Sequence, residues 1–163
     1  MRIKFEDYVD VEAKLLELGC HPAIGLAVLP ENFQSVAKIE DFRQHSETAT
    51  VKKLLRAAGL ELTDPVDRAQ RPPYVQNNAA DWVGPTLFVS SALWLQNPQV
   101  ISIALGVIAN YLTDIFRGTD TKTVKLNVVV QKSNARKYTR ISYEGGASGI
   151  AALEKVLRKA IDE

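Results

Sequence analysis

The sequence predicts an α+β domain built on a small mixed β-sheet, and three patterns support this prediction. A long apolar helix is expected over Pro98–Arg117, an alternating strand follows at Lys122–Gln131, and Ala23–Leu29 is a continuous apolar run of strand length. The strands on either side of the helix can pair in parallel through a right-handed crossover. A C-terminal β-hairpin then adds an antiparallel edge to the sheet. We therefore expect a single domain over residues 1–163, with helices packed on the faces of the sheet and one long central buried helix.

The long helix is bounded by residues that favour helix ends. Asn97 can cap its first turn, Pro98 suits the first helical position, and Gly118 can adopt the left-handed conformation that ends a helix. Apart from one thin polar stripe, the helix is apolar around its circumference. Such a composition is typical of a helix that is buried on several sides.

The polar stripe of this helix is a candidate interface. Ser102, Gly106 and Asn110 are small enough to let a second helix approach closely. One interpretation is that the stripe and its apolar neighbours contact a second subunit. The other is that the helix is covered entirely within its own domain.

The N-terminal half predicts short strands and helices. An edge strand is expected at Arg2–Phe5, followed by a helix that Asp10 caps and Gly19 ends. A second helix is predicted over Thr48–Ala58, where the apolar residues fall on one face. Between the two helices, apolar residues recur every three positions over residues 31–46, and this recurrence favours a further helix.

Residues 63–85 are expected to form a long internal loop or linker. Four prolines interrupt the segment, and a loop of this length inside a compact domain is uncommon unless it has a function or contains a short element. A short helix around Val75–Trp82 is one interpretation. Because loops on a rigid scaffold often carry binding residues, the segment is also a candidate pocket, with a structural loop as the alternative. The candidate pocket residues are Arg71, Tyr74, Asn77 and Trp82.

The hairpin 122–140 carries six basic side chains and no acidic one. Alternation places Arg136, Tyr138 and Arg140 on one face of its second strand, and Lys125 extends that face onto the first strand. The cations could contact phosphates there, while the tyrosine ring could stack on a base. The alternative is a solvated face whose charges keep an edge strand from pairing with other chains.

The turn Gly145–Gly149 joins this hairpin to a final helix. Backbone N–H groups at a strand-to-helix turn can bind a phosphate, so the hairpin and the turn together suggest binding of a nucleotide or nucleic acid as an alternative function. The turn lacks the lysine of a P-loop and the spacing of a dinucleotide fingerprint. A plain connection in which Ser148 caps the helix is the competing interpretation.

Composition argues against several classes of function. The net charge of +1 gives no overall attraction to nucleic acid, although residues 118–163 carry nine basic and five acidic side chains. The single Cys20 rules out an internal disulfide and fits a reducing cytoplasm. His21 and His45 lack metal-ligand spacing, and we find no nucleophile motif. We therefore predict no metal and no cofactor, and we favour a protein that is not an enzyme.

The remaining expectation is a non-catalytic cytoplasmic interaction or regulatory module that binds a copy of itself or another protein. No signal-like apolar segment precedes the first acidic residues. The apolar run Val100–Leu112 is also shorter than the ~20 residues of a membrane span, so no membrane partner is expected. Because the long helix has more apolar surface than a small sheet easily covers, we expect a dimer.

Overall fold

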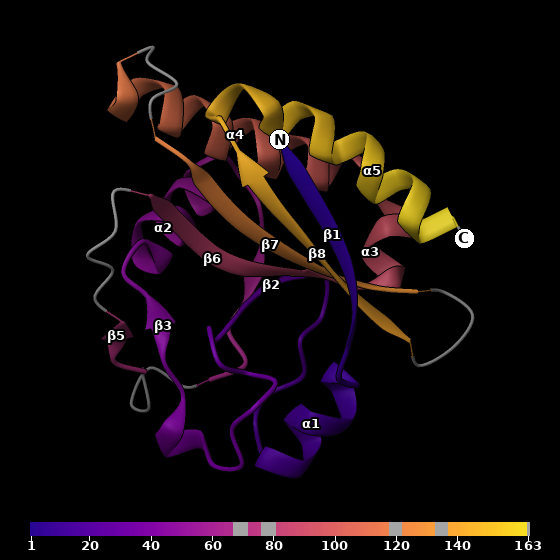
Figure 1. Ribbon diagram of the computed structural model, residues 1–163. Helices are drawn as coiled ribbons and strands as arrows, with labels where there is room; N and C mark the ends of the chain where they lie inside the picture. Colours follow the sequence, from indigo (N-terminus) through magenta and orange to yellow (C-terminus); the bar gives the residue numbers. More distant parts are fainter. Residues whose placement is uncertain (67–71, 76–80, 118–121, 133–136, 163) are drawn as a thin grey trace.

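The computed structural model describes residues 1–66, 72–75, 81–117, 122–132 and 137–162. A six-stranded mixed sheet in the order β1-β8-β7-β6-β2-β4 forms its centre (Figure 1), which confirms the predicted α+β class. The strands of this sheet are β1 (Arg2–Tyr8), β2 (Leu26–Leu29), β4 (Leu62–Thr63), β6 (Trp82–Val89), β7 (Val124–Gln131) and β8 (Tyr138–Gly145). The helices are α1 (Val11–Leu18), α2 (Thr48–Ala57), α3 (Ser91–Gln96), α4 (Gln99–Phe116) and α5 (Ile150–Asp162). Two further strands, β3 (Gln44–His45) and β5 (Tyr74–Val75), pair with each other.

The C-terminal half of the sheet follows the predicted topology in all but one respect. β6 and β7 are parallel, with α3 and α4 in the crossover between them, and β7 and β8 form the antiparallel hairpin. The prediction that this hairpin forms an edge of the sheet is wrong. β1 pairs antiparallel with β8, from Arg2 opposite Glu144 to Tyr8 opposite Tyr138. β8 is therefore an interior strand, and β1, which contains the predicted edge strand Arg2–Phe5, forms this edge of the sheet.

α4 is the middle of the helix layer on one face of the sheet, and α2 and α5 pack against it (Figure 1). Ile108, near its centre, is only 1% exposed. The buried residues of α4 are Val100, Ile101, Ala104, Leu105, Ile108, Leu112 and Phe116. By length and composition α4 could also cross a membrane, but the core helix of a folded protein passes the same test. The predicted long central buried helix is confirmed.

The ends of α4 differ from the prediction. Asn97 ends α3, a short helix that the sequence analysis missed, and Pro98 precedes the first turn of α4. The α3 helix begins after Ser90, whose hydroxyl accepts a hydrogen bond at 3.2 Å from a backbone N–H of its first turn. At the other end of α4, Arg117 adopts the left-handed conformation with a φ of 52°. Gly118 lies outside the described residues.

A second hydrophobic cluster covers part of the opposite sheet face, where α1 and residues 30–43 pack against it. The α1 helix begins and ends as predicted. The Asp10 carboxylate accepts a hydrogen bond from a backbone N–H of the first turn at 3.0 Å, and Gly19 ends the helix with a φ of 73°. In the cluster, the rings of Phe33 and Phe42 stack with their centroids 6.0 Å apart.

The prediction of a helix over residues 31–46 is wrong. The segment consists of turns, a 3-10 turn at Ile39–Asp41 and strand β3. The Asn32 side chain holds it together, because its Oδ1 accepts a hydrogen bond from the Arg43 N–H at 2.8 Å and its Nδ2 donates to the Asp41 carbonyl at 2.8 Å. The recurrence of apolar residues reflects contacts with one hydrophobic cluster and not a helical face.

Part of the loop predicted at residues 63–85 is extended structure. β5 lies within it, and β6 already begins at Trp82. Pro85 is tolerated inside β6 because the pairing with β7 shifts register there. Residues 76–80 lie outside the described residues. Of the short helix predicted around Val75–Trp82, the structure describes Val75, Asp81 and Trp82, and none of them is helical.

Candidate functional site

A polar basin lies on the sheet face opposite the helix layer. This basin is a hollow of about 280 Å³, lined by residues of β1, β7 and β8 and, across from them, by Glu31 and His45. Lys125 and Arg140 both line it, as the predicted alternation requires. Burial lowers the pKa of His45 from its ordinary value.

The two described cations that the sequence analysis proposed for anion binding have acidic partners. Lys125 Nζ lies 3.3 Å from Asp81 Oδ2, and Arg140 forms an ion pair with Glu6 on the neighbouring β1. The hydrogen bond and the charge of Arg140 hold the pKa of the Glu6 carboxyl below its ordinary value. Arg136 lies outside the described residues. These carboxylates reduce the positive charge that the basin can offer to a phosphate.

Tyr138 does not present its ring to a base. The residue is 2% exposed, and its ring packs against Phe88 with the centroids 6.1 Å apart. Its hydroxyl accepts a hydrogen bond from Gln131 Nε2 at 3.2 Å. The prediction that the Tyr138 ring could stack on a base is wrong, because the second hydrophobic cluster covers this end of the sheet face.

The turn Gly145–Gly149 makes room for a buried tyrosine. A Cβ atom on Gly149 would lie 2.2 Å from the hydroxyl oxygen of Tyr143, and a Cβ on Gly145 would lie 2.9 Å from it. The same hydroxyl donates a hydrogen bond to the Gly146 carbonyl at 2.5 Å. The close approach of Tyr143 therefore explains the two glycines by packing, without a bound phosphate.

We expect only weak, non-specific binding of polyanions. Because Lys125 and Arg140 are paired with carboxylates, single-stranded RNA and DNA should bind with a Kd of about 10⁻⁴ to 10⁻⁶ M near physiological salt. Replacing Lys125, Arg136 and Arg140 together with Gln should change little in the slope of log affinity against log salt. A nanomolar, strongly salt-dependent complex that the triple variant loses would contradict this expectation.

The residues of the predicted loop pocket are found in different surroundings. Trp82 is buried in the hydrophobic core on the helix side of the sheet, whereas Tyr74 is half-exposed on β5. Arg71 and Asn77 lie outside the described residues. Tyr74 lines a basic hollow of about 240 Å³ beside α2, and Trp82 does not line that hollow.

The basic hollow has its own acidic residue. Asp64 accepts hydrogen bonds from Lys52 Nζ at 2.5 Å and from Arg56 Nη2 at 2.8 Å. Burial raises the pKa of Asp64, but the hydrogen bonds and charges of Lys52 and Arg56 outweigh burial, and the pKa lies below its ordinary value. The sequence did not indicate this hollow, because the basic residues of α2 have the pattern of the solvated face of an ordinary amphipathic helix.

The predicted interface stripe of α4 is partly used within the chain. Ser102 Oγ donates a hydrogen bond to Glu154 Oε2 of α5 at 3.2 Å. Gly106 and Asn110 are exposed, and no atom outside the helix backbone lies within 4 Å of a Cβ built on Gly106. Two of the three stripe residues therefore remain on the outer surface of the helix layer.

An apolar groove of about 540 Å³ lies where the start of β2 and the end of α2 meet α3 and α4. It is larger than the polar basin and the basic hollow. Its apolar lining includes Ile24, Leu60, Leu93, Val100 and Ile103. Ile24 is 69% exposed and Ile103 is 44% exposed, so both present apolar surface to solvent at this groove.

The sequence did not indicate the groove, because Ala23–Leu29 was predicted as one buried strand. In the structure β2 begins only at Leu26, and Gly25 adopts a φ of 73° before it. This turn leaves Ile24 at the surface. A glycine in the middle of an apolar run was therefore the one indication that the run does not continue into the sheet.

The comparisons with known proteins give no relative: no family model matches the chain, and neither curated proteins nor solved structures give a match. Within the described ranges, no group of three or more His, Cys, Asp or Glu side chains is arranged to hold a metal ion. The geometry of the surfaces described above is therefore the basis for proposing a function.

Proposed function

We propose that this chain is a non-catalytic interaction module that binds an apolar segment of a partner polypeptide in the groove. The observation that carries the proposal is the pair of exposed isoleucines, Ile24 and Ile103, which line one apolar hollow. Apolar surface exposed in a groove is typical of protein-binding sites, where a helix or an extended segment inserts its anchoring side chains.

The polar residues that line the groove favour one kind of partner. Glu61, Gln96 and Asn97 lie beside the apolar lining and can hydrogen-bond to a bound segment. An apolar centre with polar groups around it is the usual arrangement of a protein interface. The carboxylate of Glu61 favours a segment that carries a basic residue next to its apolar anchors.

The isoleucines can supply a useful part of the binding energy. Fully burying an isoleucine contributes about 1.5–3 kcal/mol, so burying the exposed parts of Ile24 and Ile103 should contribute about 1 kcal/mol or more for each. Loss of either side chain should therefore weaken binding about fivefold, since 1.4 kcal/mol corresponds to a factor of 10.

Binding of a nucleotide or nucleic acid remains the alternative and has less support. Lys125 and Arg140 are paired with carboxylates, and Tyr138 is buried. At the turn Gly145–Gly149, the hydroxyl of Tyr143 occupies the space that the glycines provide. Of the predicted site residues that the structure describes, both cations are therefore paired and the one ring is buried.

A peptide selection tests the proposed function. A displayed library of random peptides is selected on the wild-type protein, and the affinities of the enriched peptides are then measured by fluorescence anisotropy. We expect peptides with two or more apolar anchors and a basic neighbour. Replacing Ile103 with Asp should weaken their binding about tenfold or more, because the exposed wall of the groove then carries a charge.

Ile115→Asp is the matched control. Ile115 lies on the same helix and has the same 44% exposure, but it does not line the groove. The control should bind the selected peptides like the wild type. Failure to enrich any peptide that depends on Ile103, or equal losses in the two variants, would overturn the proposal.

A further inference from the structure

β1 leaves one edge of the main sheet unpaired. It is the terminal strand, and β8 is its one neighbour in the described part of the sheet. Phe5, the central residue of the strand, is 55% exposed. An unpaired edge of seven residues offers backbone N–H and C=O groups to another strand. The exposed Phe5 ring adds apolar surface at the centre of this edge.

We propose that β1 pairs antiparallel with β1 of a second copy of this chain, about a twofold axis at Phe5. The two sheets would then form one continuous sheet across a dimer. This surface is separate from the groove of the proposed function, and the inference does not depend on that function. The partner is a second copy because the order of charges along β1 complements itself.

The register follows from the sequence of the strand. Arg2 and Lys4 precede Phe5, whereas Glu6 and Asp7 follow it. Antiparallel pairing centred on Phe5 sets Lys4 opposite the partner's Glu6. The twofold symmetry repeats this pair, so that two pairs of opposite charge flank the two phenylalanine rings.

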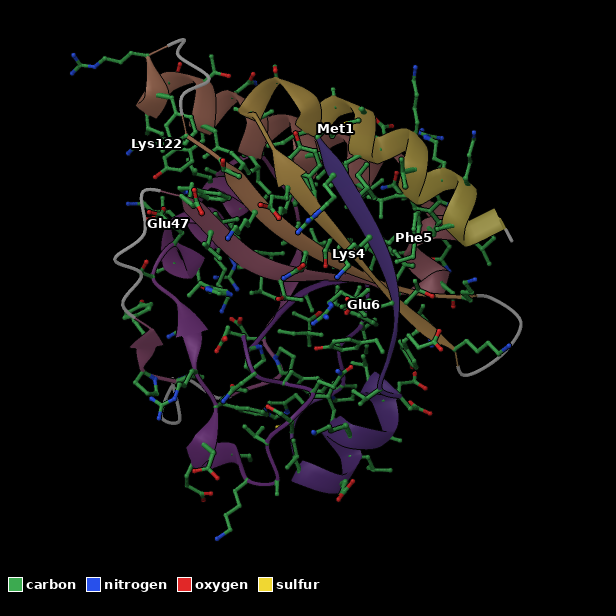
Figure 2. All side chains as sticks on the ribbon, in the orientation of Figure 1. Met1, Lys4, Phe5, Glu6, Glu47 and Lys122 are labelled. Atoms are coloured by element: carbon green, nitrogen blue, oxygen red, sulfur yellow. The ribbon has the colours of Figure 1, made fainter. Side chains whose placement is uncertain are left out.

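The same pairing fixes the neighbours of the other side chains, and it sets Ile3 opposite the partner's Asp7. Figure 2 shows Lys4 and Glu6 on one side of β1 and Phe5 on the other. Arg2 comes opposite the partner's Tyr8, whose ring already lies beside Phe33 and Arg140 of its own chain. On the side of Phe5, a shallow hollow of about 260 Å³ is lined by Phe5, Thr139 and Ala160 together with the charged residues Glu6, Asp7 and Lys132.

The charges of β1 favour antiparallel pairing with a second copy of the same strand. Lysines on an edge strand usually repel other strands. Here a parallel copy in register would set Lys4 against the partner's Lys4, which is repulsive. The antiparallel copy sets cation against carboxylate, and opposite charges in cross-strand pairs stabilise a sheet. Within one chain, Lys4 Nζ is 3.7 Å from Glu6 Oε1, so both side chains already lie on the correct face.

Charge reversal at this edge tests the proposal. Lys4→Glu and Glu6→Lys each place like charges opposite one another in a homodimer. We expect the wild type to be a dimer by sedimentation velocity and light scattering at high micromolar concentration, and each variant to associate at least tenfold more weakly. Mixing the two variants in equal amounts should restore a dimer, because every cross-strand pair beside Phe5 then joins a glutamate of one chain to a lysine of the other. Native mass spectrometry of differently tagged chains would show that the restored dimer contains one chain of each variant.

Two controls separate the outcomes. Lys155→Glu changes an exposed charge on α5 by the same amount and should leave the dimer intact. Glu6→Lys removes the partner of Arg140, so its fold is checked by circular dichroism; if it does not fold, Lys4→Glu alone carries the test, because it leaves that ion pair in place. A monomeric wild type, a Lys4→Glu variant that dimerises like the wild type, or a failure of two folded variants to combine would overturn the proposal. Ile103→Asp should not affect the dimer. The test of the dimer and the peptide selection can therefore fail independently of each other.

Discussion

Replacing Ile108 with Asp is expected to unfold the protein. Ile108 is 1% exposed in the middle of α4 and belongs to the main hydrophobic core. Removing its apolar side chain should cost about 2–5 kcal/mol. Burying a carboxylate there adds to this loss, because the charge must be desolvated or the group must take up a proton. The sum is comparable with a total stability of roughly 5–15 kcal/mol.

Thermal unfolding followed by circular dichroism checks this expectation. Asn110→Asp is the matched control, because it introduces the same carboxylate two residues further along the same helix at an exposed position. The control should keep its Tm within a few degrees of the wild type, since surface substitutions usually change stability by about 0.5 kcal/mol or less. An unchanged Tm for Ile108→Asp would mean that α4 is not the central helix.

Replacing Gly149 with Ala is expected to destabilise the protein through Tyr143. The new methyl group would lie 2.2 Å from the tyrosine hydroxyl oxygen, and Tyr143 is fully buried. Overpacking of this kind typically costs about 1–3 kcal/mol. Urea unfolding of the variant measures the loss. The Gly106→Ala variant serves as control, because its Cβ meets no atom within 4 Å and alanine should stabilise a helix by about 0.5–1 kcal/mol.

A double-mutant cycle shows whether the tyrosine hydroxyl is the cause. Tyr143→Phe removes the hydroxyl and its hydrogen bond to the Gly146 carbonyl, at a cost of about 1 kcal/mol. In this background Gly149→Ala should cost much less than in the wild type, because the colliding atom is gone. Equal costs in the two backgrounds would show that the glycine is required for another reason.

Local patterns predicted the parts of the fold that depend on neighbouring residues. The caps of α1 follow from Asp10 and Gly19, which act within one helical turn. The parallel pairing of β6 and β7 follows from a strand, a long helix and a second strand in succession. In each of these cases, the physical cause lies within the segment whose structure was predicted.

Pairings between distant segments could not be predicted in this way. β1 is joined to β8 across most of the chain, and its charges at Glu6 and Asp7 made the strand look shorter than it is. Phe33 and Phe42 meet in the second hydrophobic cluster although neither lies in a helix or a strand of the main sheet. The pairing of β1 with β8 and the burial of Tyr138 both follow from such long-range contacts, although the edge strand at Arg2–Phe5 was itself predicted.

The candidate surfaces also depend on contacts between distant segments, which a local sequence pattern does not show. The region 118–163 is basic in sequence, but carboxylates from distant segments, Glu6 and Asp81, neutralise Arg140 and Lys125. The groove is formed by several segments that are far apart in the sequence. Ile24 is the first of its lining residues along the chain, and Ile103 is the last. A short motif could not have shown either feature, because charge balance and concavity arise only when the segments come together.

Hydrogen exchange of the protein with and without a selected peptide tests the proposed binding site most directly. The proposal predicts slower exchange in α3, in the first half of α4 around Ile103, and at residues 58–61, with little change in the polar basin or the basic hollow. These segments line the groove and would lose access to solvent in the complex. Slower exchange confined to the basin residues of β7 and β8, or to α2 at the basic hollow, would contradict the groove as the binding site.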